Sequence, residues 1–482
     1  MKRLFAILLL AAMMLVTACG QPAELLPFVT GDGEIDLKGV EINWHWIGGT
    51  RTTPTYKYGT PQYDALLDRI NDIEEEFGCT LGARLPTDGL DIDLGEDKTI
   101  YDHLPDAPGD FETLELQLMA GTYKYDLVFQ NGTSERFKAG YYVPMTDLTD
   151  YIDWTDSEKY GSKNLLEAAM YDGVPYQVYP MNWPGFDGVE MCVAAYNKDL
   201  YRQYQLTDPH EFYENGTWTY ETFENELLAK VDIGKAPEGQ PQIYAFQTDE
   251  PDFYQCLIAS NNVQFVEKKD DGTLAADPYP TSFVNAITWG QKIIGEYEDI
   301  ILYDSDTYEV EEYCRGEVFM GWLPSNAVTT GAIAYNDKAV FETGIMPLPA
   351  GPDAVYGEWG QMIQEIMGFC IPISSVNQEA AAMIISELCE PLPNFEDKST
   401  FYDMVFADPL DIEIYLELGK HVKYDYTQDD DKKGRTIGEN FGEIATTPQR
   451  SLSEAMEQYR GMFTTFIEEW MVPNYNTVNS VD

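Results

Sequence analysis

Apolar runs typical of strands alternate with helically spaced apolar residues between positions 40 and 129. Residues 40–46 read as a strand, and residues 63–77 carry apolar side chains at the spacing of one helix face. The alternation continues with a strand over residues 80–84, a helix over 114–120 and a buried strand over 125–129. This order of strands and helices predicts an α/β fold on a mostly parallel sheet with crossover helices.

Three residues lie at the carboxyl ends of these predicted strands. Ligands of parallel α/β sheets bind beyond the carboxyl ends of the strands. Trp46 closes the first strand, and Gln130 and Asn131 come directly after the strand over residues 125–129. We therefore predict that Trp46, Gln130 and Asn131 bind a ligand, although a core position would explain Trp46 equally well.

The composition excludes several classes of protein. The chain has 482 residues, enough for two or three domains, and its 44% hydrophobic and 13% aromatic content excludes disorder over most of its length. With 30 basic and 83 acidic residues, the formal net charge is −53. A field this negative repels phosphate backbones, so we expect no nucleic-acid partner.

The N-terminus has the pattern of an export signal. Lys2 and Arg3 precede an apolar stretch over residues 4–15, and Cys19 follows Thr17 and Ala18. This arrangement resembles the lipobox of bacterial lipoproteins. It implies that residues 1–18 form a signal peptide, that Cys19 is lipidated, and that residues 19–37 tether the body to the outer face of the cell membrane. An ordinary signal peptide with an incidental cysteine is the alternative.

The remaining cysteines and the acidic runs do not predict a metal site. None of the other six cysteines belongs to a Cys-x-x-Cys pair, so we expect most of them to be small buried side chains. Acidic residues cluster at positions 88–97 and 429–431, but they do not follow the order of a calcium-binding loop and fit solvated loops better.

Six segments in the rest of the chain carry a family resemblance, in the family's own order. The clearest is Tyr196-Asn197-Lys198-Asp199-Leu200, which follows an apolar strand. The others span residues 217–223, 249–262, 315–320, 346–351 and 369–382. Together they resemble the extracellular solute-binding proteins of family 1, the maltose-binding-protein-like sugar receptors of ABC importers.

The resemblance implies a two-lobed type II periplasmic-binding-protein fold, with the lobes joined by two or three hinge crossings. The crossings are expected near residues 190–194, 363–368 and 425–435. Lobe I would then comprise residues 38–190 plus 367–425, and lobe II residues 191–366 plus 426–482.

The resemblance also implies a function. The chain would be the substrate-binding lipoprotein of an ABC importer, a monomer without a cofactor that captures a mono- or oligosaccharide between its lobes for a membrane permease. A surface glycan hydrolase and a glycan-binding lipoprotein without an importer are the alternatives. Catalytic motifs such as His-Glu-x-x-His and Gly-x-Ser-x-Gly do not occur. With 83 acidic residues, a carboxylate pair at glycosidase separation is expected by chance.

Neutral sugars combine an apolar ring face with a rim of hydroxyl groups, so aromatic rings, carboxylates and amides are their natural partners. Trp183 lies in a Pro/Gly loop where a core role is hard to explain, and Trp359 lies in a loop flanked by glycines. From the resemblance, Trp322 and Glu190 are expected at the sugar, with Trp183 as the opposing wall. The other positions that the resemblance places in the second-lobe segment are Asp252 and Tyr254.

Overall fold

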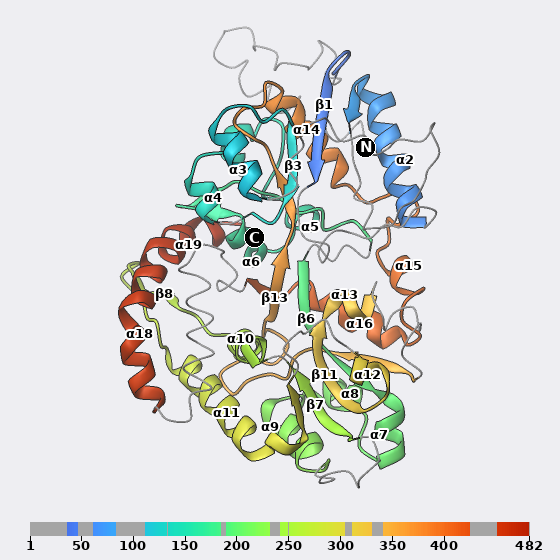
Figure 1. The fold of residues 1–482 in the computed structure, drawn as a ribbon, viewed down its shortest axis with the longest axis vertical. Coiled ribbons are helices and arrows are strands. Elements are labelled where there is room, and N and C mark those ends of the chain that lie inside the picture. The colour runs from blue at the N-terminus through green and yellow to red at the C-terminus, as the bar shows by residue number, and fades with distance from the viewer. Residues whose placement is uncertain are drawn as a thin grey trace.

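Two α/β lobes, each built on its own sheet, lie one above the other along the long axis of the molecule (Figure 1). The structure is a computed structural model that describes residues 36–46, 61–82, 111–132, 134–184, 189–231, 242–248, 250–303, 311–329, 341–424 and 451–481. The expected two-lobed α/β architecture is confirmed. Cys19, its tether and the two acidic clusters lie outside the described residues.

Lobe I contains a four-stranded sheet in the order β14-β3-β1-β2. The strands β1 (Glu41–Trp46), β2 (Thr80–Gly82) and β3 (Leu127–Gln130) are parallel, and β14 (Gly368–Cys370) runs antiparallel to β3. The main helices of this lobe are α2 (Pro61–Phe77), α3 (Phe111–Met119) and α14 (Gln378–Leu388). These elements confirm the alternation predicted between residues 40 and 129.

The packing of α2 shows why the helical spacing is informative. Leu66, Ile70, Ile73 and Phe77 are buried at intervals of three or four residues, which places them on one face of the helix. The helix ends where Gly78 adopts a φ of +68°, a conformation that side chains with a Cβ rarely adopt. The shorter elements of lobe I are α4 (Ser134–Lys138), η2 (Met145–Leu148), α5 (Ser157–Tyr160), α6 (Lys163–Ala168), β4 (Met170–Tyr171) and β5 (Val174–Pro175).

Lobe II contains a seven-stranded sheet in the order β10-β7-β11-β6-β13-β15, with β12 also paired to β6. Its strands are β6 (Val189–Asn197), β7 (Tyr244–Thr248), β10 (Ile301–Tyr303), β11 (Val318–Pro324), β12 (Thr343–Met346), β13 (Gln361–Ile366) and β15 (Val422–Tyr424). Its helices are α7 (Lys198–Tyr204), α8 (Pro209–Glu214), α9 (Tyr220–Phe223), η3 (Glu224–Leu228), α10 (Glu250–Ser260), α11 (Thr281–Tyr297), η4 (Glu298–Ile300), α12 (Glu311–Cys314), α13 (Ser325–Thr329) and α16 (Pro409–Leu418). A hairpin of β8 (Val266–Lys268) and β9 (Leu274–Ala276) projects from it.

The segment Tyr196–Leu200, which carries the clearest family resemblance, comprises the end of strand β6 and the start of helix α7. The side chain of Asn197, the last residue of β6, accepts hydrogen bonds from the backbone N–H groups of Asp199 and Leu200. These bonds satisfy two of the unpaired donors at the start of α7, which is the role of an N-cap.

Two neighbouring strands lie at the boundary between the lobes. β6 enters lobe II at Val189, and β13 returns beside it as its antiparallel neighbour. β13 continues through Met367 into β14, which joins the sheet of lobe I. The two strands therefore form a hydrogen-bonded hinge.

Residues 409–424 belong to lobe II, which differs from the expected assignment of residues 367–425 to lobe I. Helix α16 packs against β12, and its Asp411 accepts a hydrogen bond of 2.6 Å from the N–H of Ile345. The short helix α15 (Ser399–Tyr402) precedes it at the edge of the lobe boundary (Figure 1). We therefore assign residues 409–424 to lobe II and its hinge. The expected crossing at residues 425–435 lies outside the described residues.

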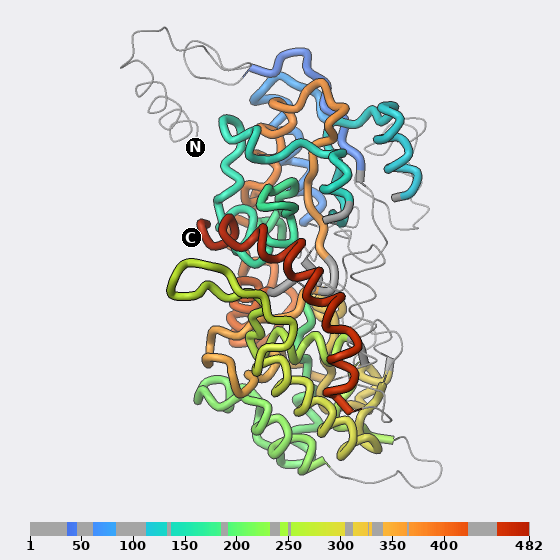
Figure 2. Tube along the Cα trace, turned by 90° about the vertical axis from the view of Figure 1, so that its left-hand side faces the viewer, coloured from blue at the N-terminus to red at the C-terminus, as the bar shows by residue number. Residues whose placement is uncertain are grey.

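The C-terminal segment also differs, because it contacts both lobes. It consists of α18 (Leu452–Phe466), the π-helical turn η6 (Ile467–Met471) and α19 (Val472–Val478), and begins with a capping box between Ser451 and Glu454. Figure 2 shows this helix, in red, running along the molecule from one lobe to the other. Val478 and Val481 pack in a cluster with Leu166 and Met170 of lobe I. The assignment of residues 426–482 to lobe II alone is corrected accordingly.

Two further sequence expectations can be compared with the fold. All six cysteines after Cys19 are free and buried, as expected. Within the described ranges, no helix combines the length and the apolar character needed to span a membrane.

A buried charge cluster fixes α16 to lobe II. The Nζ atom of Lys198, whose side chain is only 3% exposed, lies 3.1 Å from Asp411 Oδ2 and 2.9 Å from Asp408 Oδ2. On the other side, His210 Nε2 lies 3.0 Å from Asp411 Oδ1. Charges this deeply buried are stable only when they are paired, so removal of one partner leaves another uncompensated.

The charge cluster predicts a pH-dependent contribution of His210 to stability. Burial lowers the pKa of His210, but its hydrogen bond to Asp411 and the negative charge of that carboxylate outweigh burial, and the net pKa is raised. The stabilisation is therefore present below the unfolded pKa of about 6.5 and is lost as the pH rises through the folded pKa. In urea denaturation, His210→Gln should lower the free energy of unfolding more at acidic than at alkaline pH. An equal loss on both sides of neutrality would contradict a charged role.

Candidate functional site

The carboxyl ends of the parallel strands of both lobes are directed at the boundary between the lobes. In lobe I, the end of β3 is beside Gly368, where the chain arrives from the hinge, and β1 runs parallel to β3. In lobe II, β11 ends opposite Cys192, near the start of β6, and β7 and β10 run parallel to β11. Because ligands of α/β sheets bind at such strand ends, this boundary is the candidate site.

Of the residues predicted at the end of β3, Asn131 fits a ligand contact best. Its side chain is half-buried, and its Oδ1 atom is shielded from solvent without a hydrogen-bond donor in the described part of the chain. Its backbone oxygen accepts a hydrogen bond of 2.6 Å from Arg136, which fixes the local chain. A buried carbonyl oxygen without a donor is a favourable position for a ligand hydroxyl group.

Gln130 has a structural role instead. Its side chain is fully buried, and its Nε2 atom lies 3.6 Å from the sulfur of Cys370 on the neighbouring strand. Its backbone oxygen accepts a hydrogen bond of 2.7 Å from Gln177. These contacts place Gln130 within lobe I, which corrects the expectation that its side chain faces the ligand.

Trp183 belongs to the core of lobe I. Its ring is 2% exposed and packs against Trp44, Phe129 and Phe369 at centroid distances of 6.2, 6.1 and 5.9 Å. Its Nε1 atom donates a hydrogen bond of 2.6 Å to the backbone oxygen of Leu388. Trp183 is therefore a core anchor of lobe I, and its ring is not exposed for stacking on a sugar.

Trp322 is enclosed in the core of lobe II. The ring is 1% exposed and is surrounded by Phe223, Phe246 and Phe253 at centroid distances of 5.6, 5.0 and 5.3 Å. It lies inside β11 rather than beyond its end, opposite Ala194 of β6. This position corrects the expectation that Trp322 forms an aromatic wall of the ligand site.

Trp359 and Tyr254 are also core residues. Trp359 is 4% exposed, donates a hydrogen bond of 2.8 Å to the backbone oxygen of Leu348 and packs edge-on against Tyr356. Tyr254 is fully buried in α10, next to Phe253 and in contact range of Gly290 of α11. Neither ring offers a surface to a ligand, which corrects both expectations.

The three remaining predicted residues lie at the lobe boundary. Asp252 is half-buried in the first turn of α10, directly after the end of β7. The backbone of Trp46 pairs with Phe129, and the backbone of Glu190 pairs with Glu365 of β13 at the hinge. The side chains of Trp46, Glu190 and Glu365 lie outside the described parts of the structure. Sequence reasoning missed Glu365, because only the register of β13 against β6 brings it to Glu190.

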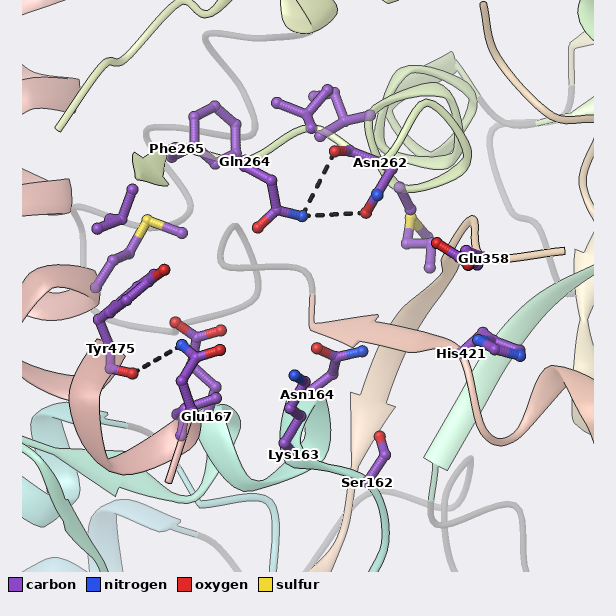
Figure 3. A pocket seen from close by; sticks show the side chains of 18 of the residues that line it. Ser162, Lys163, Asn164, Glu167, Asn262, Gln264, Phe265, Glu358, His421 and Tyr475 are labelled. Atoms are coloured by element: carbon purple, nitrogen blue, oxygen red, sulfur yellow. Dashed lines mark hydrogen bonds between the residues drawn. The ribbon is translucent and has the colours of Figure 1, made fainter. Parts of the chain in front are cut away.

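A cavity between the lobes, called the second hollow here to distinguish it from the strand-end boundary, was not predicted at all. It is a cavity of about 810 Å³ between α6 of lobe I, the C-terminal half of α10, the start of β13 and the C-terminal helix. Figure 3 shows Asn164 and Glu167 on one side and Asn262 and Gln264 on the other. Its lining includes none of Asn131, Trp183, Asp252 and Ser325, so it is a separate space from the strand ends. It combines four distant segments, which explains why no local pattern predicted it.

The cavity is lined by both apolar and polar side chains, among them Phe265, Asn262 and His421. The side chain of Gln264 donates to Oδ1 of Asn262 over 3.0 Å, and His421 Nε2 lies 3.1 Å from Glu417. The hydrogen bond from Lys420 and, after it, the one from His421 hold the pKa of Glu417 below its usual value despite partial burial. Among the described residues, no three His, Cys, Asp or Glu side chains form a group that could hold a metal ion.

The position of Trp322 leads to a prediction that separates a core role from a ligand-binding role. Trp322→Ala should lower the free energy of unfolding by about 3–5 kcal/mol, because it leaves a cavity among three phenylalanine rings. Urea denaturation measures this loss, and Trp322→Phe should recover part of it. An unchanged free energy of unfolding together with lost ligand affinity would show instead that Trp322 contacts the ligand.

The fold can now be compared with those of known proteins. Neither a family model nor a curated protein matches the chain. Among solved structures, a cyclic α-maltosyl-1,6-maltose binding protein from Arthrobacter globiformis is similar over 90% of this chain and 99% of its own, with 13% identity and a TM-score of 0.59. UgpB from Mycobacterium tuberculosis, solved with glycerophosphocholine, matches over 89% and 98%, with 15% identity and a TM-score of 0.56.

A third similar structure is the ABC substrate-binding protein Lmo0181 from Listeria monocytogenes in complex with cycloalternan. It matches over 89% of this chain and 99% of its own, with 14% identity and a TM-score of 0.55. At identities this low, the likeness establishes the fold. The chain has the two-lobed type II periplasmic-binding-protein fold that it shares with these solute-binding proteins.

Proposed function

We propose that this protein is the substrate-binding lipoprotein of an ABC importer and that it captures a carbohydrate between its lobes. The observation that carries the proposal is the arrangement of the two sheets, whose parallel strands end at the same boundary on either side of the β6–β13 hinge. A ligand at such a boundary can contact both lobes at once, so its binding energy can favour a closed arrangement. A permease could then distinguish the closed form from the open one.

Two observations favour a neutral carbohydrate as the ligand. The net charge of −53 disfavours capture of polyanionic solutes. Two of the similar proteins bind cycloalternan or cyclic maltosyl-maltose. UgpB, the third, was solved with glycerophosphocholine, so polar solutes other than sugars are the second ligand class to test.

The binding groups proposed for the sugar are those that remain at the lobe boundary. Asn131 offers a buried carbonyl oxygen without a donor in the described residues, and Asp252 offers a carboxylate at the start of α10. We propose that Glu190 and Glu365 accept sugar hydroxyl protons at the hinge and that Trp46 packs on the sugar ring. Carboxylates and amides are strong acceptors for hydroxyl groups, which gives these residue types their role.

A ligand screen tests the function directly. The intact protein is screened by thermal unfolding against a panel of sugars, oligosaccharides and glycerophosphodiesters. A true ligand at about 100 times its Kd adds roughly 2.7 kcal/mol of stability and raises the melting temperature. X-ray scattering with the same ligand should show a smaller radius of gyration, because the lobes close. A panel without any stabilising carbohydrate would contradict the proposal, and hydrolysis of a glycan in the panel would support an enzyme instead.

A pair of matched variants makes this test specific for the strand-end site. Glu190→Gln removes a charged acceptor at the hinge and should weaken binding roughly ten- to a hundredfold, corresponding to about 1.4–2.8 kcal/mol. The control is Glu358→Gln, which changes a residue that lines the second hollow. If only the control variant loses affinity, the ligand binds in the second hollow and the strand-end site is wrong.

Membrane anchoring is part of the proposal and rests on the lipobox at Cys19. Cys19→Ala should abolish incorporation of radioactive palmitate, and the protein should be released to the medium or accumulate as the precursor. Palmitate labelling of growing cells measures lipidation, and separation of the membrane fraction from the medium measures release. A variant that is still labelled and still sediments with the membrane would disprove lipidation of Cys19.

A further inference from the structure

One end of the C-terminal helix, α18, is fixed to lobe II. In α18, the ring of Phe463 packs edge-on against Tyr279, directly before α11, at a centroid distance of 5.6 Å. The guanidinium group of Arg460, one turn earlier, lies 5.1 Å from the same ring. Both contacts come from one face of α18, so this part of the helix is fixed to lobe II.

The other end of the helix is fixed to the β4–β5 hairpin of lobe I. Trp470 is 6% exposed, packs against Tyr171 of β4 at 5.1 Å and lies beneath the ammonium group of Lys138 at 5.5 Å. Further along, Val478 is buried in a cluster with Leu166 and Met170. The contacts therefore extend over two turns of helix.

Two hydrogen bonds join the helix to the tip of that hairpin. The N–H of Gly173 donates to Asn474 Oδ1 over 2.8 Å, and the oxygen of Gly173 accepts from Thr477 Oγ1 over 2.9 Å. Asn474 is only 4% exposed, so its amide is committed to this contact. Gly173 has a φ of +75°, and a Cβ there would lie 3.1 Å from the oxygen of Pro473. The hairpin tip is thus shaped to fit the helix.

The helix changes its geometry after its contact with lobe II, where its contacts with lobe I begin. Residues 467–471 form a π-helical turn, and Pro473 follows in the first turn of α19. π-Turns and prolines interrupt the regular hydrogen bonds of an α-helix and are where helices bend. The π-helical turn therefore follows the contact of Phe463 with lobe II and includes Trp470, the first contact with lobe I.

We propose that the C-terminal helix is a strap between the lobes, additional to the hinge, which stabilises the lobe arrangement seen here and yields at its π-helical turn. Rotation of the lobes must either bend this turn or detach Trp470 and Asn474 from lobe I. The strap therefore adds a free-energy difference between lobe arrangements. The inference rests on the two-lobed fold and not on the identity of the ligand.

A linker insertion tests the strap without removing either attachment. A short Gly-Ser segment inserted between Glu468 and Glu469 leaves the contacts with Tyr279 and Gly173 in place but makes their connection flexible. In the absence of ligand, X-ray scattering of the full chain should show a radius of gyration shifted from that of the unmodified protein. The matched control carries the same segment between Asp271 and Gly272, at the exposed tip of the β8–β9 hairpin.

A second variant contains no inserted segment and therefore controls for local misfolding caused by the insertion. Asn474→Ala combined with Thr477→Ala removes the two hydrogen bonds with Gly173 and should accelerate amide hydrogen exchange over residues 470–478. The same variant should shift the radius of gyration in the same direction as the linker insertion. If exchange accelerates while both variants keep the radius of gyration of the unmodified protein, the helix does not restrain the lobes and the proposal is overturned. Ligand-free measurement separates this outcome from any failure of the proposed function.

Discussion

Strand β6 is the element on which the rest of the structure depends. Its nine residues pair with β13 at the hinge over their first part and with β11 and β12 in lobe II over the remainder. Val193, Ala194 and Ala195 are completely buried, as expected for a strand covered on both faces. Strand β6 belongs both to the hinge and to the sheet of lobe II. The backbone hydrogen bonds that hold this sheet together therefore also fix its orientation relative to the sheet of lobe I.

The aromatic residues show how this geometry divides core from site. Trp183 and Trp322 anchor the cores of the two lobes, and both side chains are almost completely buried. A buried indole contributes more area to a core than any other side chain, so lobes with short strands depend on such anchors. Asn131 and Asp252, at the strand ends, are only half-buried and are among the groups proposed to contact a ligand.

The lobes are connected by more than their hinge strands. The C-terminal helix contacts Tyr279 in lobe II and Gly173 in lobe I. Connections of this kind make any change in lobe arrangement a cooperative event, because several buried contacts must change together. The second hollow between α6 and α10 is lined in part by Met471, Tyr475 and Val478 of the same C-terminal helix.

The sequence by itself determined the local elements and, through the ordered family-like segments, the fold. The spacing of Leu66, Ile70 and Ile73 is a local property of α2. Strand β6 is likewise visible in the sequence as an apolar run followed by a capped helix. Only the tertiary structure decided which of the candidate side chains are buried in the lobe cores. Whether Trp322 is a core anchor or a sugar platform depends on Phe223, Phe246 and Phe253, which approach from three separate segments. Burial is the sum of such distant contacts, and no local pattern encodes it.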